Sequence, residues 1–419
     1  MKLNYKRTLL VGFAFLSICV FWGVYDAVIP LILKDTFTLG ETATGVIMAL
    51  DNILALFMLP FFGALSDKTR TPIGRRMPYI LIGTALAVVS MIFLPIADNS
   101  VSFVMFVVFL GIVLFAMGTY RAPAVALMPD VTEKPLRSKA NAMINLMGAV
   151  GGILAILIMK FGIIDAPKPD YTWVFVTTAI IMVVSVVVLF FTIKENKCRV
   201  VDADEKDEDE NGVKTKMPKN VFKSLVFMLL SVFLWFMAYN AVTSTFSRYA
   251  GEVWGLTGGG FTDALLVATV SAVVSYFPIG LISGKIGRKK VIMAGIILMT
   301  IAFGTGFFFK SYSPLMNLIF CAVGIGWAAI NVNSYPMVVE MSKGSDVGKY
   351  TGLYYTFSMS SQIATPILSG FLIEVLDYEI LFPYATVFMA LAFVTMLFVK
   401  HGDSKPTKEQ FIDEMEQGD

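Results

Sequence analysis

The sequence predicts an all-α integral membrane protein with twelve transmembrane helices in two bundles of six. Hydrophobic residues make up 57% of the chain and charged residues 15%, against about 45–50% and about 25% in soluble domains. Apolar windows long enough to cross a bilayer core, about 20 helical residues, recur along the whole chain. A charged segment near the middle separates six windows from the next six. Mean hydropathy is +0.74, which excludes a soluble enzyme.

The twelve windows are expected to form one helix each. They cover residues 8–33, 42–66, 78–97, 100–128, 139–164, 171–193, 223–247, 262–284, 291–309, 313–339, 347–375 and 379–400. The first window follows a basic lead-in, as in a signal peptide, but its apolar run is too long and no small-residue cleavage site follows it. We therefore expect a retained helix.

The longest interruption reaches from about residue 194 to 220 and has mixed charge with almost no apolar side chains. Such a composition predicts an unfolded linker. No loop is long enough for a catalytic domain. The predicted organisation is an N-terminal bundle at 1–193, a cytoplasmic linker at 194–222, a C-terminal bundle at 223–400 and a cytoplasmic tail at 401–419.

Basic residues are distributed unequally between the two sides of the predicted membrane. If the N-terminus is cytoplasmic, the inward segments carry 27 of the 33 Lys and Arg residues and the outward ends and loops carry five. The positive-inside rule then predicts that both termini are cytoplasmic. We expect a multi-pass protein of the cell (plasma) membrane, with the bilayer as its surroundings.

Several kinds of site are excluded by residue counts. Cysteines occur only at 19, 198 and 321, and their spacing fits neither a disulfide framework nor a zinc site. The single histidine, His401, follows the last apolar window, which excludes a histidine-based metal centre. A net charge of +2 gives no basic excess for nucleic acid. No cofactor and no metal are expected, and a monomer is the default state.

The two halves of the chain contain related loops. Gly63-Ala-Leu-Ser-Asp67 through Gly74-Arg75-Arg76 follows the second window, and Gly280-Leu-Ile-Ser through Gly287-Arg288-Lys289-Lys290 follows the eighth. Both loops keep the order Gly, Ser, Gly and basic cluster. Repeats of six helices around a central linker indicate a transporter whose site lies between the two bundles near the membrane midplane.

The loop at residues 63–76 resembles the signature of the major facilitator superfamily, and the resemblance covers essentially the whole chain. It implies two six-helix bundles related by pseudo-two-fold symmetry. Within that superfamily, three stretches resemble the glycoside-pentoside-hexuronide cation symporters and the related sucrose/proton symporters. These stretches are residues 50–79, 121–142 and 235–251. The resemblance implies coupled uptake of a glycoside or sugar with H⁺ or Na⁺.

The chain departs from this branch at three positions. Melibiose-type members have a second acidic residue where this chain has Ala55 and an Asp where it has Arg121. Sucrose-type members place an Arg nearer the position of Val125. The sodium-binding carboxylate cluster of the melibiose type is therefore incomplete, which favours H⁺ as the coupling ion.

Three ionisable residues lie well inside the predicted helices, away from the helix ends: Asp26, Asp51 and Arg121. Such residues are costly in lipid and usually mark a transport pathway. Asp51 lies near the midplane, and Arg121 cannot lose its proton. We predict that Asp51 is the switch for the coupling ion and that Arg121 is a fixed charge with which it pairs. The alternative is a permanent structural ion pair.

Uncharged polar and aromatic residues in the helices are candidates for binding a sugar. Asp26 beside Trp22 and Tyr25 would bind sugar hydroxyls, or it is a solvated vestibule carboxylate. The other candidates are Asn141, Asn145, Trp235, Tyr239, Asn240, Asn331, Asn333, Tyr355, Ser358 and Gln362. A neutral polyhydroxylated ligand needs many hydrogen bonds and no counter-charge. For each aromatic residue, packing between helices is the alternative.

Charged residues at the predicted cytoplasmic rim form two candidate gating pairs. Asp67 with Arg75 and Arg76, and Asp130 with Arg137, resemble the gating ion pairs of the superfamily. Ordinary positive-inside charge is the alternative for the basic residues, but it does not account for Asp67.

The leading interpretation is a proton-coupled symporter of a neutral sugar or glycoside, a di- or oligosaccharide, that works by alternating access. A drug or metabolite/proton antiporter of the same fold is the main alternative. The 24 methionines favour the antiporter, whereas the polar helix faces oppose it. A membrane-embedded enzyme would need clustered His, Cys or carboxylates near one interface, and the chain has none.

Overall fold

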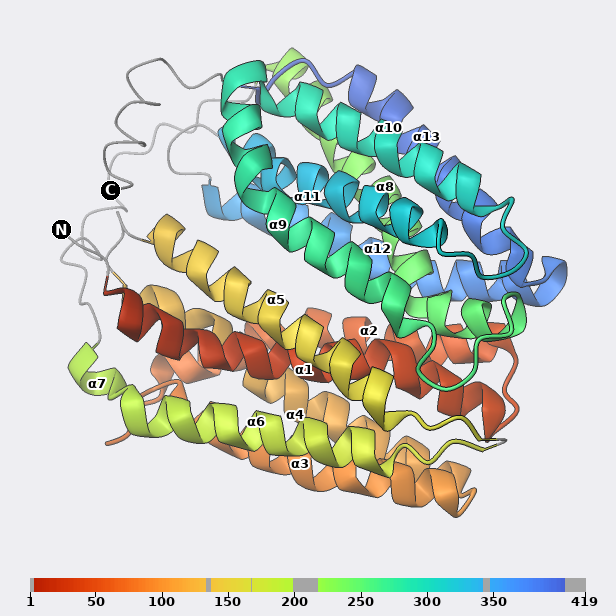
Figure 1. The fold of residues 1–419 in the computed structure, drawn as a ribbon. Helices are drawn as coiled ribbons and strands as arrows, with labels where there is room; N and C mark the ends of the chain where they lie inside the picture. Colours follow the sequence, from red (N-terminus) through yellow and green to blue (C-terminus); the bar gives the residue numbers. More distant parts are fainter. Residues whose placement is uncertain (1–3, 133–136, 167, 199–217, 342–346, 404–419) are drawn as a thin grey trace. The chain divides into compact units, whose positions relative to one another are not determined.

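The computed structural model describes residues 4–132, 137–166, 168–198, 218–341 and 347–403, and these residues form helices and short connections (Figure 1). Side chains are described for all of them except 129, 137–139, 141, 142, 339, 347–349 and 351. Within this part of the chain, twelve helices are long and apolar enough to cross a membrane. The predicted all-α class and the predicted number of spans are confirmed.

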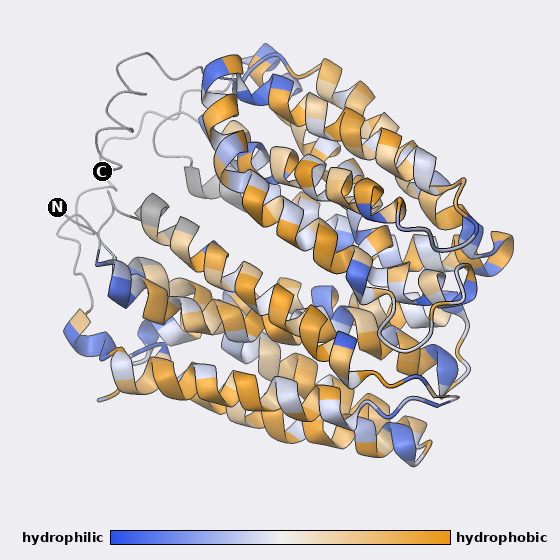
Figure 2. Ribbon diagram, in the orientation of Figure 1, coloured by the Kyte–Doolittle hydropathy of each residue, from blue (hydrophilic) through white to orange (hydrophobic). Residues whose placement is uncertain are grey.

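The first half of the chain supplies six spanning helices and one short helix. They are α1 (Tyr5–Asp35), α2 (Glu41–Lys68), α3 (Met77–Asn99), α4 (Phe103–Asp130), α5 (Arg137–Gly162), α6 (Thr172–Thr192) and the four-residue α7 (Glu195–Cys198). Apolar residues dominate the middle of the spanning helices, and polar residues gather at their ends (Figure 2).

The second half repeats this order. Its helices are α8 (Lys219–Glu252), α9 (Thr262–Ile286), α10 (Arg288–Gly306), α11 (Met316–Glu340), α12 (Val347–Leu376), the 3₁₀ helix η4 (Tyr378–Ile380) and α13 (Leu381–Leu397). The chain divides into two compact units. The first comprises residues 1–208 with 256–262, and the second comprises 209–255 with 263–419.

Corresponding helices pack in the same way within each unit. In the first unit, α1 packs against α5 and α6, and α3 packs against α4 and α6. In the second unit, α8 packs against α12 and α13, and α10 packs against α11 and α13. The repeat seen in the sequence is thus also a repeat in the helix packing.

Two charged side chains are buried inside helices that the sequence windows ended too early. Helix α3 continues to Asn99, so that Asp98 is fully buried and accepts a 2.5 Å hydrogen bond from the Thr36 hydroxyl. Helix α8 continues to Glu252, and Arg248 is only 5% exposed. A hydropathy window stops where polar residues begin, whereas the helix continues through them.

The short helix α7 corrects the prediction for the start of the linker. Residues 195–198 were expected to be unfolded because they are polar, but they form a helical turn with Glu195 only 1% exposed. The reason is a set of hydrogen bonds that the Glu195 carboxylate accepts from the backbone at the start of α3. Residues 199–217 of the predicted linker lie outside the described residues, and its last residues, from 219 to 222, already belong to helix α8.

Candidate functional site

Helices α1, α2 and α4 of the first unit carry the three ionisable residues predicted from the sequence. Asp26 is exposed on the surface of its unit, and Asp51 and Arg121 are partly exposed. The two carboxylates and the guanidinium lie within electrostatic range of one another. Residues far apart in the sequence are therefore brought into one charged cluster on the first unit.

Arg121 does not form a direct ion pair with either carboxylate. Among the described residues, no carboxylate oxygen of Asp26 or Asp51 lies within 4.0 Å of its guanidinium nitrogens. The guanidinium carbon instead lies 5.7 Å from the ring centroid of Trp22. Such a cation–π contact stabilises by about 0.5–2 kcal/mol. Asp51 accepts a 2.7 Å hydrogen bond from the Asn52 side-chain amide, and its carboxylate has no fixed cation in contact.

Two aromatic residues of α1 present buried polar atoms next to this cluster. The rings of Trp22 and Tyr25 meet edge to face with centroids 5.1 Å apart. The indole nitrogen of Trp22 and the hydroxyl of Tyr25 are buried, and neither has a hydrogen-bond partner in the described part of the chain. A buried polar group without a partner costs about 1–3 kcal/mol, so both atoms are suited to bind a polar ligand.

On α5, the structure describes only one of the two predicted asparagines. Asn145 is exposed on the surface of the first unit. The side chain of Asn141 lies outside the described residues, so this prediction is not examined by the structure.

The second unit places a group of aromatic and amide side chains on α8 and α11. Tyr239 and Trp327 stack with ring centroids 3.7 Å apart and an angle of 3° between the planes. The indole nitrogen of Trp235 and the amide nitrogen of Asn240 are buried and, among the described residues, lack a hydrogen-bond partner. These groups are all uncharged, in contrast to the charged cluster of the first unit.

The remaining candidates of the second unit differ in their surroundings. Asn331 is exposed on α11, whereas Asn333 is 1% exposed and its amide donates to the Ala329 carbonyl of the same helix at 2.8 Å. That bond fits the packing alternative for Asn333. On α12, Tyr355 is 54% exposed and Gln362 is partly exposed, while Ser358 is buried.

The charged residues at one end of the first unit form a connected network. The Arg75 guanidinium makes a two-pronged contact with Asp130, with Nη2–Oδ1 at 2.5 Å and Nε–Oδ2 at 3.0 Å. Arg76 donates from Nε to the same Asp130 carboxylate at 2.9 Å and also pairs with Asp67. Arg75 Nη1 lies 3.9 Å from Asp67. The predicted partnership of Asp67 with the two arginines is thus present.

Among the described residues, the Asp130 carboxylate is held by Arg75 and Arg76, and its predicted pairing with Arg137 stays a prediction. A planar guanidinium that matches both carboxylate oxygens is a strong partner, and Arg75 provides this geometry. Burial lowers the pKa of Arg75, yet the hydrogen bond and negative charge of Asp130 outweigh burial and raise that pKa above its ordinary value. The side chain of Arg137 lies outside the described residues.

Glu195 completes this network and was missed in the sequence. Its carboxylate accepts backbone N–H bonds from Arg75, Arg76 and Met77 at 2.8–3.0 Å. These N–H groups lie at the start of α3, where a helix has no internal acceptors and where its dipole favours negative charge. Gly74 has φ +124, and a Cβ there would lie 2.1 Å from Glu195 Oε2. The turn therefore requires glycine.

The second unit contains a parallel arrangement at the start of α10. Gly287 has φ +98, and a Cβ there would lie 3.0 Å from the carboxylate of Asp403. Asp403 accepts the backbone N–H of Lys289 at 3.3 Å. Arg288 pairs with Glu340 at the end of α11, as the arginines of the first unit pair with Asp130 at the end of α4. In the sequence, Glu195, Glu340 and Asp403 could be recognised only by their position just after, or at the end of, a spanning helix.

Twelve spanning helices in two similarly packed units, with polar side chains inside the helices and a charged network at the end of each unit, are the architecture of a membrane transporter. A sequence profile of the Major Facilitator Superfamily matches residues 11–277 and 263–416. The chain belongs to this superfamily. In the described part of the chain, no group of three or more His, Cys, Asp or Glu could hold a metal ion.

The chain is similar in sequence to several membrane transporters, whose names differ in the substrate they give. An uncharacterized MFS-type transporter of Methanocaldococcus jannaschii is 22% identical over 365 residues, 86% of each chain. The multidrug resistance protein MdtG of Salmonella schwarzengrund is 23% identical over 305 residues, 71% of each chain. The isoprimeverose transporter of Lactiplantibacillus pentosus is 23% identical over 278 residues, 63% of this chain and 56% of its own.

Solved structures share the fold. A bacterial homologue of the human lysosomal transporter Spinster has a TM-score of 0.72 at 14% identity and covers 95% of both chains. The xylose transporter XylE from E. coli has a TM-score of 0.67 at 15% identity and covers 98% of both chains. At these identities the likeness concerns the fold alone.

Proposed function

We propose that the protein is a proton-coupled symporter that takes up a neutral sugar or glycoside, a di- or oligosaccharide, by alternating access. The observation that carries this proposal is that the two units present different kinds of side chain. The first unit holds Asp26 and Asp51 close to Arg121 but without a direct ion pair. The second unit offers uncharged donors and aromatic rings. The resemblance to the glycoside-pentoside-hexuronide and sucrose/proton symporters agrees with it.

The charges of Asp26, Asp51 and Arg121 in the first unit are suited to coupling with one cation. With both carboxylates ionised, the cluster of Asp26, Asp51 and Arg121 has a net charge of −1, because the arginine stays protonated. Binding one proton makes the cluster neutral and removes a barrier to crossing a medium in which charge is costly. Ala55 in place of a second helix-two carboxylate favours a proton over Na⁺ as that cation.

The polar atoms without partners suit a sugar. The indole nitrogens of Trp22 and Trp235, the Tyr25 hydroxyl and the Asn240 amide can each donate a hydrogen bond, and a neutral sugar offers several hydroxyl acceptors. The partly exposed rings of Trp22 and Tyr239 would pack against the apolar C–H faces of a sugar ring. The isoprimeverose transporter among the relatives supports a sugar as the substrate.

A second candidate function is a drug or metabolite/proton antiporter of the same fold. The multidrug resistance protein among the relatives favours it. One experiment separates the two functions: uptake by proteoliposomes against a panel of sugars and drugs, with imposed pH and sodium gradients compared. Sugar accumulation driven by a pH gradient supports the symporter, whereas proton-driven drug efflux without sugar uptake would overturn it.

The network around Asp67, Arg75, Arg76 and Asp130 is proposed to act as the cytoplasmic gate. Its ion pairs would hold the first unit's end in one arrangement and rearrange during the transport cycle. Glu195 would act as a positioning residue, because it fixes the backbone from which both arginines project.

The first prediction concerns the proposed orientation, with cytoplasmic termini. In a variant without the three native cysteines, Arg70→Cys, in the exposed loop after α2, should react only with a reagent that reaches the cytoplasm. Ile164→Cys, 71% exposed in the loop after α5, should react from outside intact cells. The reverse labelling of the two positions would overturn the orientation.

The second prediction concerns Arg121. Arg121→Ala removes the only positive charge of the cluster, so the carboxylates should retain their protons and fail to complete the cycle. The initial rate of pH-driven uptake should fall at least about tenfold, which corresponds to 1.36 kcal/mol in a barrier. Arg121→Lys keeps the charge and should retain part of the activity. Wild-type accumulation by the Ala variant would place Arg121 outside the mechanism.

A further inference from the structure

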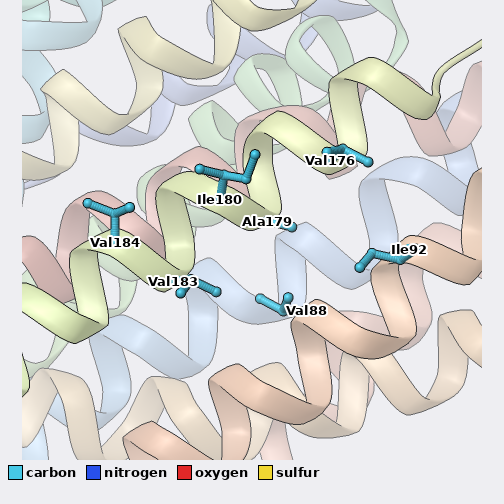
Figure 3. Close-up of a pocket in the computed structure, with 7 residues that line it drawn as sticks. All are labelled: Val88, Ile92, Val176, Ala179, Ile180, Val183 and Val184. Atoms are coloured by element: carbon cyan, nitrogen blue, oxygen red, sulfur yellow. The ribbon is translucent and has the colours of Figure 1, made fainter.

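The Arg121 side chain rests against an aromatic ring although two carboxylates lie within its electrostatic range. The guanidinium carbon lies 5.7 Å from the ring centroid of Trp22 on α1, and the charge of Arg121 acts on both Asp26 and Asp51. Among the described residues, no hydrogen bond or ion pair holds the guanidinium. The pocket between α3 and α6 of the same unit is lined by aliphatic side chains alone (Figure 3) and offers it no polar partner.

An arginine near a carboxylate normally binds both carboxylate oxygens in a two-pronged contact, as an arginine of the charged network does in this unit. Arg121 does not, although it is partly exposed and has a long, flexible side chain. The Asp51 carboxylate instead accepts a hydrogen bond from the Asn52 amide at 2.7 Å. The contact with Trp22 is therefore the interaction that sets where the guanidinium lies relative to the two carboxylates.

Two neighbours on α1 fix the orientation of the Trp22 ring. Phe21 meets it edge to face with centroids 5.0 Å apart, and Tyr25 meets it in the same manner at 5.1 Å. Both neighbours are 2% exposed, and edge-to-face contact is a preferred geometry of aromatic pairs. The ring thus offers the guanidinium a face in a fixed position.

The distance between the guanidinium and the carboxylates decides how readily the carboxylates bind a proton. A cation in contact with a carboxylate favours its ionised form, and a permanent ion pair would leave little affinity for a proton. A cation–π contact attracts the guanidinium without neutralising its charge. Arg121 on the Trp22 ring therefore still contributes positive charge to the cluster, but it does not occupy either carboxylate.

We propose that Trp22 is a positioning residue for Arg121: its ring holds the guanidinium away from Asp26 and Asp51, so that these carboxylates bind and release the coupling proton. This inference rests on the proposed function, because it takes the two carboxylates as the proton-binding groups. It gives Trp22 a role in coupling that is separate from any contact with the sugar.

The titratable groups around Arg121 and the two carboxylates come from α1 and α2. Helix α1 contributes Cys19, Tyr25 and Asp26, and α2 contributes Asp51. Helices α3 and α5 also pack against α4, but in the described part of the chain they add no titratable side chain to the surroundings of the two carboxylates. A change in proton binding after a substitution of Trp22 is therefore to be explained within this set.

Infrared spectroscopy tests this role without a transported sugar. The full-length protein in lipid nanodiscs is titrated with acid, and the C=O band of protonated carboxyl groups is compared with that of a counterpart carrying Asp26→Asn and Asp51→Asn. In Trp22→Leu the guanidinium should move onto a carboxylate, so the midpoint of the difference band should shift to lower pH by about one unit. Trp22→Phe keeps a weaker aromatic face and should give a smaller shift of the same sign.

A double variant shows whether Trp22 acts through Arg121. Arg121→Ala removes the cation and should move the midpoint to higher pH, because the ionised carboxylates lose a stabilising charge. In that background Trp22→Leu should cause no further shift, because the ring has no guanidinium to hold. Phe15→Leu is the matched control, since Phe15 is also a partly exposed aromatic residue of α1, and it should leave the midpoint unchanged.

Equal elution profiles in size exclusion confirm that the variants fold, and Trp22→Phe alone carries the test if Trp22→Leu does not fold. Unchanged midpoints in the Trp22 variants would overturn the proposal and leave Trp22 with packing or sugar binding only. A shift to higher pH, or an equal shift of Trp22→Leu in the Arg121→Ala background, would overturn it as well. A wild-type protein without the difference band at any pH would instead contradict the proton-binding site and, with it, the proposed symport.

Discussion

Asp51→Asn should abolish uphill accumulation of sugar by a pH gradient while leaving sugar exchange across the membrane intact. Asparagine is nearly the same size as aspartate and can still hydrogen-bond with Asn52, but it cannot titrate. The variant therefore mimics a carrier that is always protonated. Such a carrier can bind sugar and move it in either direction, but it cannot release the proton that must leave before the empty carrier returns.

The expected size of this effect follows from the proton-motive force. A pH difference of one unit contributes about 1.4 kcal/mol per proton, which supports roughly tenfold accumulation for one proton per sugar. In Asp51→Asn the ratio of internal to external sugar should fall to about one, measured in proteoliposomes with an imposed pH gradient. Counterflow of labelled sugar into liposomes preloaded with unlabelled sugar should remain.

Two control variants locate the coupling residue. Asp51→Glu keeps a titratable carboxylate on α2 and should retain some accumulation. Asp26→Asn removes the other carboxylate of the cluster, on α1, and should weaken sugar binding more than coupling. Accumulation at the wild-type level in Asp51→Asn would exclude Asp51 from coupling and direct attention to Asp26, whereas loss of counterflow would make Asp51 a ligand of the sugar.

The spanning helices were predictable because membrane insertion depends on a local sum of side-chain hydropathy. All twelve windows correspond to helices in the structure, and the errors are confined to the ends. At the end of α3, a hydrogen bond to a distant residue contributes. Thr36, in a different part of the chain, donates to the buried Asp98, and no window on residues 78–97 contains that information.

The partners of charged residues were predictable only within one loop. Asp67 lies nine residues from Arg76, and their pairing follows from a single recognisable motif. Glu195 is separated from Arg75 by 120 residues and sits in a polar stretch whose composition resembles a disordered linker. The sequence shows that such an acid exists, but only the packing of α6 against α3 brings it to the start of α3.

For the residues predicted to bind a sugar, the sequence did not show which polar side chains are already engaged in the protein's own hydrogen bonds. Asn333 and Asn240 look alike in the sequence, since both are amides in apolar helices. In the structure, the Asn333 amide donates to its own helix, whereas the Asn240 amide nitrogen is buried without a partner among the described residues. Helical periodicity gives the direction of a side chain, but it does not show whether the side-chain amide already donates to a backbone carbonyl.

Glu195→Ala should destabilise the first unit and impair transport, although Glu195 is remote from the charged cluster of α1, α2 and α4. The substitution leaves the backbone N–H groups of Arg75, Arg76 and Met77 without their acceptor. Loss of a helix cap costs about 0.5–2 kcal/mol, and stranding buried donors costs about 1–3 kcal/mol. We expect a loss of about 2 kcal/mol, or a Tm lower by roughly 4–8 °C in detergent.

Glu195→Gln and Asp403→Ala provide graded comparisons for this prediction. Glutamine keeps one acceptor oxygen but loses the negative charge that the start of α3 favours, so its Tm should lie between those of the wild type and Glu195→Ala. Asp403 occupies the related place in the second unit but, among the described residues, accepts a single backbone N–H, at 3.3 Å, and its removal should cost less. If Glu195→Ala unfolded at the wild-type temperature, the carboxylate would contribute nothing to the position of Arg75 and Arg76, and the gate would have to be explained by Asp67 and Asp130 alone.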